Sequence, residues 1–124
     1  MAKTPVVYRG FRSAYGAIVD RTDGVYIKER NDIVSHSNGL EWGYGGSGPA
    51  QCAIALLMDT LEDYDEISDK TSWALNHYQS FKWDVIARLS RTGWLLPQED
   101  VRAWISYQLV PDKKKFAGRV VCND

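Results

Sequence analysis

The residues best suited to chemistry lie in one short stretch, positions 43–48, where four glycines surround Tyr44 and Ser47. Pro49 follows at once and opens an apolar run, so the stretch is expected to lead directly into a helix. Backbone N–H groups at the start of a helix attract anions, because they lack partners there and the helix dipole adds partial positive charge. The ligand-binding residues predicted for such a site are Tyr44, Gly45, Gly46, Ser47, Gly48 and Gln51.

The glycine pattern differs from the two common phosphate-binding motifs. A P-loop requires a lysine and then serine or threonine after its last glycine, whereas Gly48 is followed by Pro49. A dinucleotide fingerprint requires a preceding parallel strand and a βαβ unit. Two other roles therefore stay open for the loop: close packing beneath Trp42 and Tyr44, and contact with a partner protein.

Nucleophilic catalysis has little support in the sequence. Cys52 lies in the first turn of the expected helix and His36 is a conceivable base, but the apolar neighbours of Cys52 indicate a buried, inert thiol. Ser47 lacks the Gly-x-Ser-x-Gly elbow, because Pro49 stands two positions after it. Cys52 and Cys122 have no metal-ligand spacing. We predict no catalytic residues, no metal site and no cofactor, and the sequence favours a protein that is not an enzyme.

Two clusters of charge are ambiguous. Six acidic residues lie between positions 59 and 69, where they indicate a solvated connector or a docking patch for a basic partner. Lys113, Lys114 and Lys115 follow one another without aromatic residues between them, so together with Arg9 and Arg12 they give only a weak nucleic-acid signal.

The first part of the chain predicts a small antiparallel sheet of two or three strands within residues 6–30. Residues 6–9 are rich in β-formers, and the short β-prone runs 17–20 and 25–28 flank Asp23-Gly24, a frequent hairpin turn. Residues 31–40 have no clear periodicity and are expected to form a loop.

The remainder predicts two or three helices. The first, residues 49–61, is apolar on nearly every side and should be the buried central element. The second, about 72–90, would be capped by Ser72, and the third, 97–109, would open with Pro97. Residues 94–96 are expected to be an apolar link, and residues 111–124 a peripheral strand or a loosely held tail. The expected fold class is α+β, with the small N-terminal sheet packed with the helices around the central one.

Composition indicates one domain over residues 1–124. The chain is 44% hydrophobic with a net charge of −1, which gives no general attraction to nucleic acid or anionic membrane. Neither a membrane span nor the apolar core of a signal peptide is visible, so the expected location is the cytoplasm.

The segment 42–51, WGYGGSGPAQ, resembles a bacterial and phage family known as domain of unknown function 6166. The likeness extends from Tyr8 through the helix face of Tyr78 and Phe81 to Trp94, and the tail beyond Asp112 lies outside it. Relatives usually have leucine where this chain has Cys52, which further weakens a catalytic cysteine. The resemblance implies a small accessory protein of the kind carried by phages and other mobile elements, and it brings no known activity.

These observations favour a non-enzymatic protein that binds a host protein or protein complex, as an inhibitor or modulator of a host machine such as a defence system. Aromatic side chains often anchor interfaces. An anion- or nucleotide-binding protein that uses the glycine loop is the alternative, and nucleic-acid binding through Arg9, Arg12 and the lysine tail is a weaker one. The predicted interface residues are Trp42, Tyr44, Trp73 and Trp83.

Overall fold

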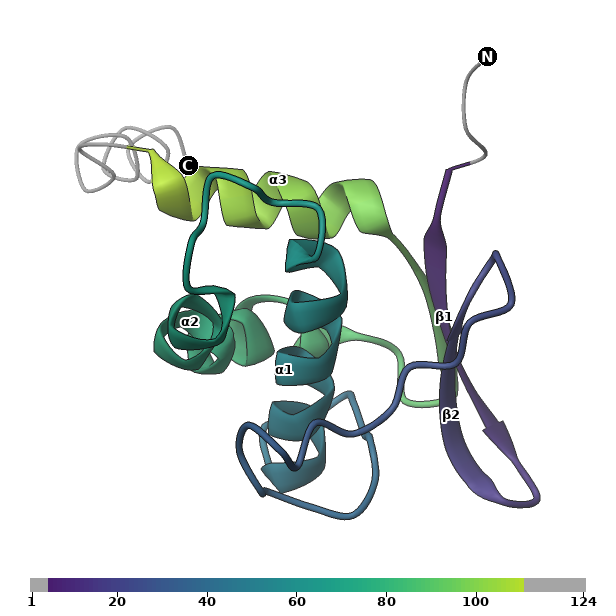
Figure 1. The fold of residues 1–124 in the computed structure, drawn as a ribbon. Coiled ribbons are helices and arrows are strands. Elements are labelled where there is room, and N and C mark those ends of the chain that lie inside the picture. The colour runs from purple at the N-terminus through teal and green to yellow at the C-terminus, as the bar shows by residue number, and fades with distance from the viewer. Residues whose placement is uncertain (1–4, 111–124) are drawn as a thin grey trace, which may run out of the picture.

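The central element of the structure, a computed structural model that describes residues 5–110, is helix α1 (Ser47–Leu61). Every residue from Gly48 to Leu57 is buried, because the helix lies between the β-sheet and helix α2 (Lys70–Asp84), and helix α3 (Gln98–Leu109) crosses its C-terminal end (Figure 1). A helix that is apolar all round is stable only when other elements cover every face. The predicted central helix and the α+β fold are therefore confirmed.

The sheet has three antiparallel strands in the order β2-β1-β3. Strand β1 (Val7–Ser13) is central and forms a hairpin with β2 (Gly16–Arg21), while β3 (Gly93–Pro97) pairs with its other edge. Gly10 pairs with Trp94, and a Cβ atom on Gly10 would lie 2.2 Å from Trp94 Cε2. The absence of a side chain at Gly10 is what allows the indole ring to lie across the strand.

Two predictions for the strands need correction. Residues 94–96 are not a link but the middle of β3, whose alternate residues Trp94 and Leu96 face the core. The turn at Gly24 forms, with φ of 89°, but residues 25–28 pair with β2 only through the bridge between Asp20 and Tyr26. The hairpin is cut short because the chain leaves the sheet after this bridge to reach the start of α1 (Figure 1).

The helices begin and end close to the predicted positions, but the residue that caps α2 is not the predicted one. Helix α2 starts two residues early because Asp69, rather than Ser72, is its N-cap, and the Asp69 carboxylate accepts a hydrogen bond from the Ser72 N–H at 3.1 Å. The helix ends at Asp84, and the short 3₁₀ helix η1 (Ile86–Arg88) completes the predicted segment. The tail predicted for 111–124 lies outside the described residues. None of the helices in the described part has the length and apolar character needed to cross a bilayer.

Candidate functional site

Two glycines of the loop before α1 form a floor for two aromatic rings. A Cβ atom on Gly45 would lie 2.1 Å from Trp83 Cη2, and one on Gly46 would lie 2.7 Å from Tyr44 Cε2. Neither position has room for a side chain while the rings stay where they are. The glycines therefore pack against Tyr44 and Trp83, and not against Trp42, which the packing alternative from the sequence names.

The start of the same loop is fixed to the segment after α2. Gly43 has φ of 87°, a conformation that favours glycine, and its N–H donates to the Ile86 carbonyl at 3.0 Å. Side-chain carbons of Arg91 lie directly against it. The loop is thus held at a defined position on η1 and on the chain that follows.

Tyr44 and Trp83 are both exposed, and both contact this floor. Their exposed fractions are 40% and 57%, and they rest on consecutive residues of one loop. Arg91 Cζ lies 5.1 Å from the Tyr44 ring centroid, and Lys82 Nζ lies 4.4 Å from the Trp83 ring. We refer to Tyr44, Trp83 and Arg91 as the aromatic surface; Lys82, which lies against it, is buried (8% exposed). Neither cation forms an ion pair with another described residue.

The other two predicted interface residues lie elsewhere. Trp42 is fully buried, where its indole N–H donates to the Arg91 carbonyl at 3.1 Å and its ring meets Trp94 edge-on. Trp73 is half-buried on α2 and stacks on His77 at 3.9 Å between ring centroids. Trp42 therefore offers no surface to a partner, and Trp73 offers only part of its ring.

The predicted ligand residues separate into two groups. Ser47 is exposed at the first turn of α1, beside the loop glycines. Gln51 is fully buried, and its side-chain oxygen accepts from the Arg30 N–H at 2.5 Å while its amide donates to the Val34 carbonyl at 2.9 Å. Gln51 therefore holds the loop of residues 30–34 against α1, a structural task that occupies its polar atoms.

Ser47 and Gly48 line a groove of about 680 Å³, which we call the β2 groove. Its walls are β2 and residues 37–41, and its charged lining residues are Glu29 and Glu41. Arg12 offsets the charge of Glu41, but Glu29 has no ion-pair partner among the described residues, and its carboxylate repels an anion. The anion-binding alternative stays a prediction, but the local charge disfavours it.

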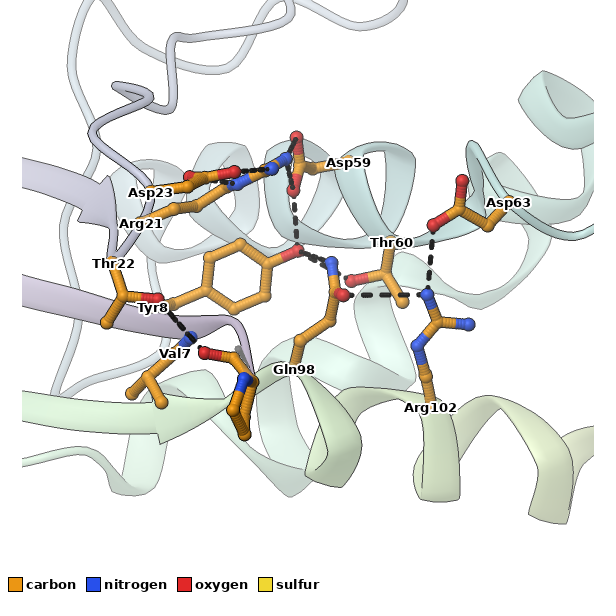
Figure 2. A network of polar contacts seen from close by, with 11 residues as sticks. Val7, Tyr8, Arg21, Thr22, Asp23, Asp59, Thr60, Asp63, Gln98 and Arg102 are labelled. Carbon is orange, nitrogen blue, oxygen red and sulfur yellow. Dashed lines mark hydrogen bonds and ion pairs between the residues drawn. The ribbon is translucent and has the colours of Figure 1, made fainter. Parts of the chain in front are cut away.

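A buried polar network, which the sequence did not reveal, centres on Tyr8 (Figure 2). The Tyr8 hydroxyl donates to Asp59 at 2.6 Å, lies 2.9 Å from the Thr60 hydroxyl and accepts from the Gln98 amide at 2.7 Å. Arg21 binds both oxygens of Asp59 at 3.1 Å. The network joins β1, β2, α1 and α3, and the only signal for it was two polar residues, Asp59 and Thr60, near the end of an apolar helix.

The network is suited to fastening elements rather than to acid–base chemistry. Burial, and then the hydrogen bond to Asp59, raise the pKa of Tyr8 well above its ordinary value, so the phenol stays protonated. The hydrogen bond to Asp23 raises the pKa of Arg21, which stays charged. The Tyr8 hydroxyl, both Asp59 oxygens, the Thr60 hydroxyl and the Gln98 amide nitrogen each have a side-chain hydrogen-bond partner, so they are engaged in structural contacts.

Cys52 and His36 do not form a catalytic pair. Cys52 is buried, and desolvation raises the pKa of its thiol, which keeps it in the unreactive protonated form. His36 Nε2 instead lies 2.6 Å from the Tyr78 hydroxyl. Within residues 5–110, no group of three acidic, histidine or cysteine side chains is arranged to hold a metal ion.

The charged residues singled out in the sequence are largely paired. Arg9 binds Asp20 at 2.7 Å and Arg12 binds Glu41 at 2.9 Å, so neither arginine presents an uncompensated charge to a nucleic acid. The lysines at 113–115 lie outside the described residues. Among the acidic residues, Asp59 belongs to the Tyr8 network and Asp69 caps α2.

The molecule is thus a small α+β domain in which a glycine loop leads into a buried helix and carries two exposed aromatic rings. The chain belongs to the family described as "Family of unknown function (DUF6166)", whose model matches residues 8–107. The match extends from Tyr8 of the polar network almost to the end of α3. No curated protein and no solved structure matches the chain.

Proposed function

We propose that this protein is a non-enzymatic binding protein that docks on a partner protein through the aromatic surface. The observation that supports this most directly is the exposure of Tyr44 and Trp83 together on the glycine floor. Tyrosine and tryptophan are enriched among the residues that contribute most of the free energy of binding at protein interfaces. The buried thiol of Cys52 and the fully bonded hydroxyl of Tyr8 support a role without catalysis.

Contact with the floor also restricts the conformations of the two rings before binding. Gly45 and Gly46 lie in contact with the rings of Trp83 and Tyr44, so one face of each ring is packed in the free protein while the rest is exposed. A side chain that is ordered before binding loses less conformational entropy on association. In this proposal the glycines of the motif support the two aromatic side chains of the interface.

The charge of the aromatic surface indicates the chemistry of the partner. Arg91 is exposed over the Tyr44 ring and has no carboxylate partner among the described residues, whereas Lys82, over the Trp83 ring, is buried. A complementary surface would supply acidic side chains at its rim, which steer the encounter and fix the orientation of the complex.

The resemblance to a bacterial and phage family supports a cellular setting for this binding. In that setting we propose a small accessory protein of a phage or mobile element, present in the host cytoplasm. Its partner would be a host protein machine, including a defence system, which it inhibits or modulates by covering a functional surface.

The test is a pull-down from host lysate with the tagged full chain, with and without nuclease, followed by affinity measurement on the purified partner. We expect a stoichiometric protein partner that survives nuclease and binds Trp83→Ala at least about tenfold more weakly. Leu75→Ala is the matched control, because Leu75 is an exposed apolar residue of the same helix (41% exposed) and is not part of the aromatic surface.

Three results would contradict the proposal. They are the absence of any partner, unchanged affinity of Trp83→Ala, and loss of the partner on nuclease treatment. The last would favour nucleic-acid binding, which should also weaken steeply as salt rises.

A further inference from the structure

We propose that the β2 groove is a second docking site, which binds an extended segment of a partner protein by adding it as a strand to the edge of β2. The segment carries a basic side chain that faces Glu29. This goes beyond the proposed function, because it assigns a different surface with the opposite charge.

The edge of β2 is open at one residue. All residues of β2 are in register with β1, but in an antiparallel pair the backbone N–H and C=O groups of alternate residues point away from the partner strand. Those of Val19 and Arg21 point away from β1, since the Ile27 N–H donates to the Val19 carbonyl and the Arg21 N–H donates to the Val25 carbonyl. By the same alternation the N–H and C=O of Ala17 point to this outer side, at a position that residues 25–27 do not cover. An exposed edge with unpaired backbone groups is a template for another strand.

The groove lies along this open position. It is lined by β2 residues 16–19, including Ala17, and by residues 37–41 on the other side, with a volume of about 680 Å³. Tyr15 and Tyr26, 95% and 61% exposed, line it together with Tyr44. Tyrosines provide large contact areas at small entropic cost, which suits binding of a flexible segment.

The charge of the groove selects the kind of segment. Glu29 forms no ion pair with a described residue, and Glu41 is held by Arg12. Since Arg12 offsets the charge of Glu41, Glu29 is the uncompensated charge of the lining, and it attracts a lysine or arginine and repels an acidic segment. The aromatic surface, with its cation Arg91 unpaired among the described residues, would have the reverse preference.

The test uses a phage-displayed library of random dodecapeptides, selected on the immobilised full chain, and fluorescence anisotropy with the strongest peptides. We expect peptides with alternating apolar residues and at least one basic residue. Ala17→Pro should weaken their binding about tenfold, because proline removes the outward N–H that β1 does not use. Ala17→Ser keeps the N–H and should bind normally.

Two further measurements keep the result independent of how Ala17→Pro folds. N-methylation of alternate peptide amides should abolish binding in one register and leave it intact in the other, as strand pairing requires. Glu29→Gln should weaken binding about threefold, whereas Glu66→Gln, an exposed acid of the distant connector, should leave it unchanged.

The proposal is overturned by any of four results. These are no enriched peptide, acidic peptides only, equal binding to Ala17→Pro and Ala17→Ser, or dimerisation of the chain through this edge that Ala17→Pro removes. Trp83→Ala should leave peptide binding unchanged, so failure at the β2 groove is distinguishable from failure of the aromatic surface.

Discussion

The hydroxyl of Tyr8 bonds to three side chains from two helices, which makes it the most connected polar atom described above. Tyr8→Phe would leave Asp59, Thr60 and Gln98 without this partner in a buried setting. We expect the free energy of unfolding to fall by about 1–3 kcal/mol, the usual cost of leaving buried polar groups unpaired. Urea denaturation measures it, and Tyr26→Phe is the control because that hydroxyl is exposed. Equal stability of the two variants would show that the network contributes little.

The same residue predicts a dependence on alkaline pH. In the unfolded chain the phenol loses its proton near its ordinary pKa of 10, whereas the folded protein holds the pKa of Tyr8 above that value. The unfolded state therefore binds fewer protons above pH 10, so the stability due to Tyr8 is complete below pH 10 and is lost as pH rises further. The difference in unfolding free energy between wild type and Tyr8→Phe should shrink from about pH 9 to about pH 11. A constant difference would contradict this.

Two glycines beside tryptophan rings should respond differently to alanine. At Gly10 the new Cβ meets Trp94, which is buried and packed against Trp42, so Gly10→Ala should cost about 1–3 kcal/mol of unfolding free energy or more. At Gly45 the new Cβ meets the exposed ring of Trp83, which can rotate outward. The loss of unfolding free energy in Gly45→Ala should therefore stay below about 1 kcal/mol.

Gly45→Ala should instead displace the indole signal of Trp83 in an NMR spectrum and weaken partner binding. Gly39→Ala is the control for both variants, since nothing lies within 4 Å of the added atom. A large loss of stability in Gly45→Ala would mean that the ring of Trp83 is fixed more firmly than its exposure suggests.

At the scale of the element, the start of α2 separates two candidate caps. Because the Asp69 carboxylate accepts from the backbone N–H of Ser72, Asp69→Ala should lower the melting temperature, whereas Ser72→Ala keeps that N–H, loses only the side-chain interaction with Asp69 and should lower it less. The bonds from Ser72 lower the pKa of Asp69, so this contribution is present above the ordinary aspartate pKa and is lost on acidification below it. A larger effect of Ser72→Ala would reverse the assignment.

The sequence predicted the elements whose signals are local. The glycines, Pro49 and the apolar run located α1 within two residues, and Pro97 located α3 within one. Strand β3 was missed because Trp94-Leu95-Leu96 is short and apolar on both faces, and its partner β1 lies more than eighty residues earlier. The first hairpin turns at Ala14 and Tyr15, where no two-residue glycine signal marks it.

The candidate sites were predicted less completely, for the same reason. Tyr44 and Trp83 were both singled out as interface residues, but only the fold brings them to one loop. Trp42 and Gln51 carry no local sign of burial, and their partners, at Arg91 and in residues 30–34, are distant or irregular in sequence. The Tyr8 network was invisible because the three side chains bonded to the Tyr8 hydroxyl are 51 to 90 positions from it.

For the whole molecule, the shared core and the Tyr8 network predict cooperative unfolding. The sheet, α1 and α3 cannot separate without breaking the bonds of Tyr8, and the core cluster includes residues of every layer. Urea transitions followed by far-UV circular dichroism, which reports the helices, and by tryptophan fluorescence should therefore coincide. Separate midpoints would show that the sheet and the helices unfold as independent units.

The contact between Gly45 and Trp83 also has an evolutionary consequence. Trp83 of helix α2 contacts the loop at Gly45, where any side chain would overlap the tryptophan ring in its present position. Within the family, these two positions should covary: a larger residue at position 45 should accompany a smaller one at position 83. Relatives that keep glycine but have lost the tryptophan would be expected to recognise different partners.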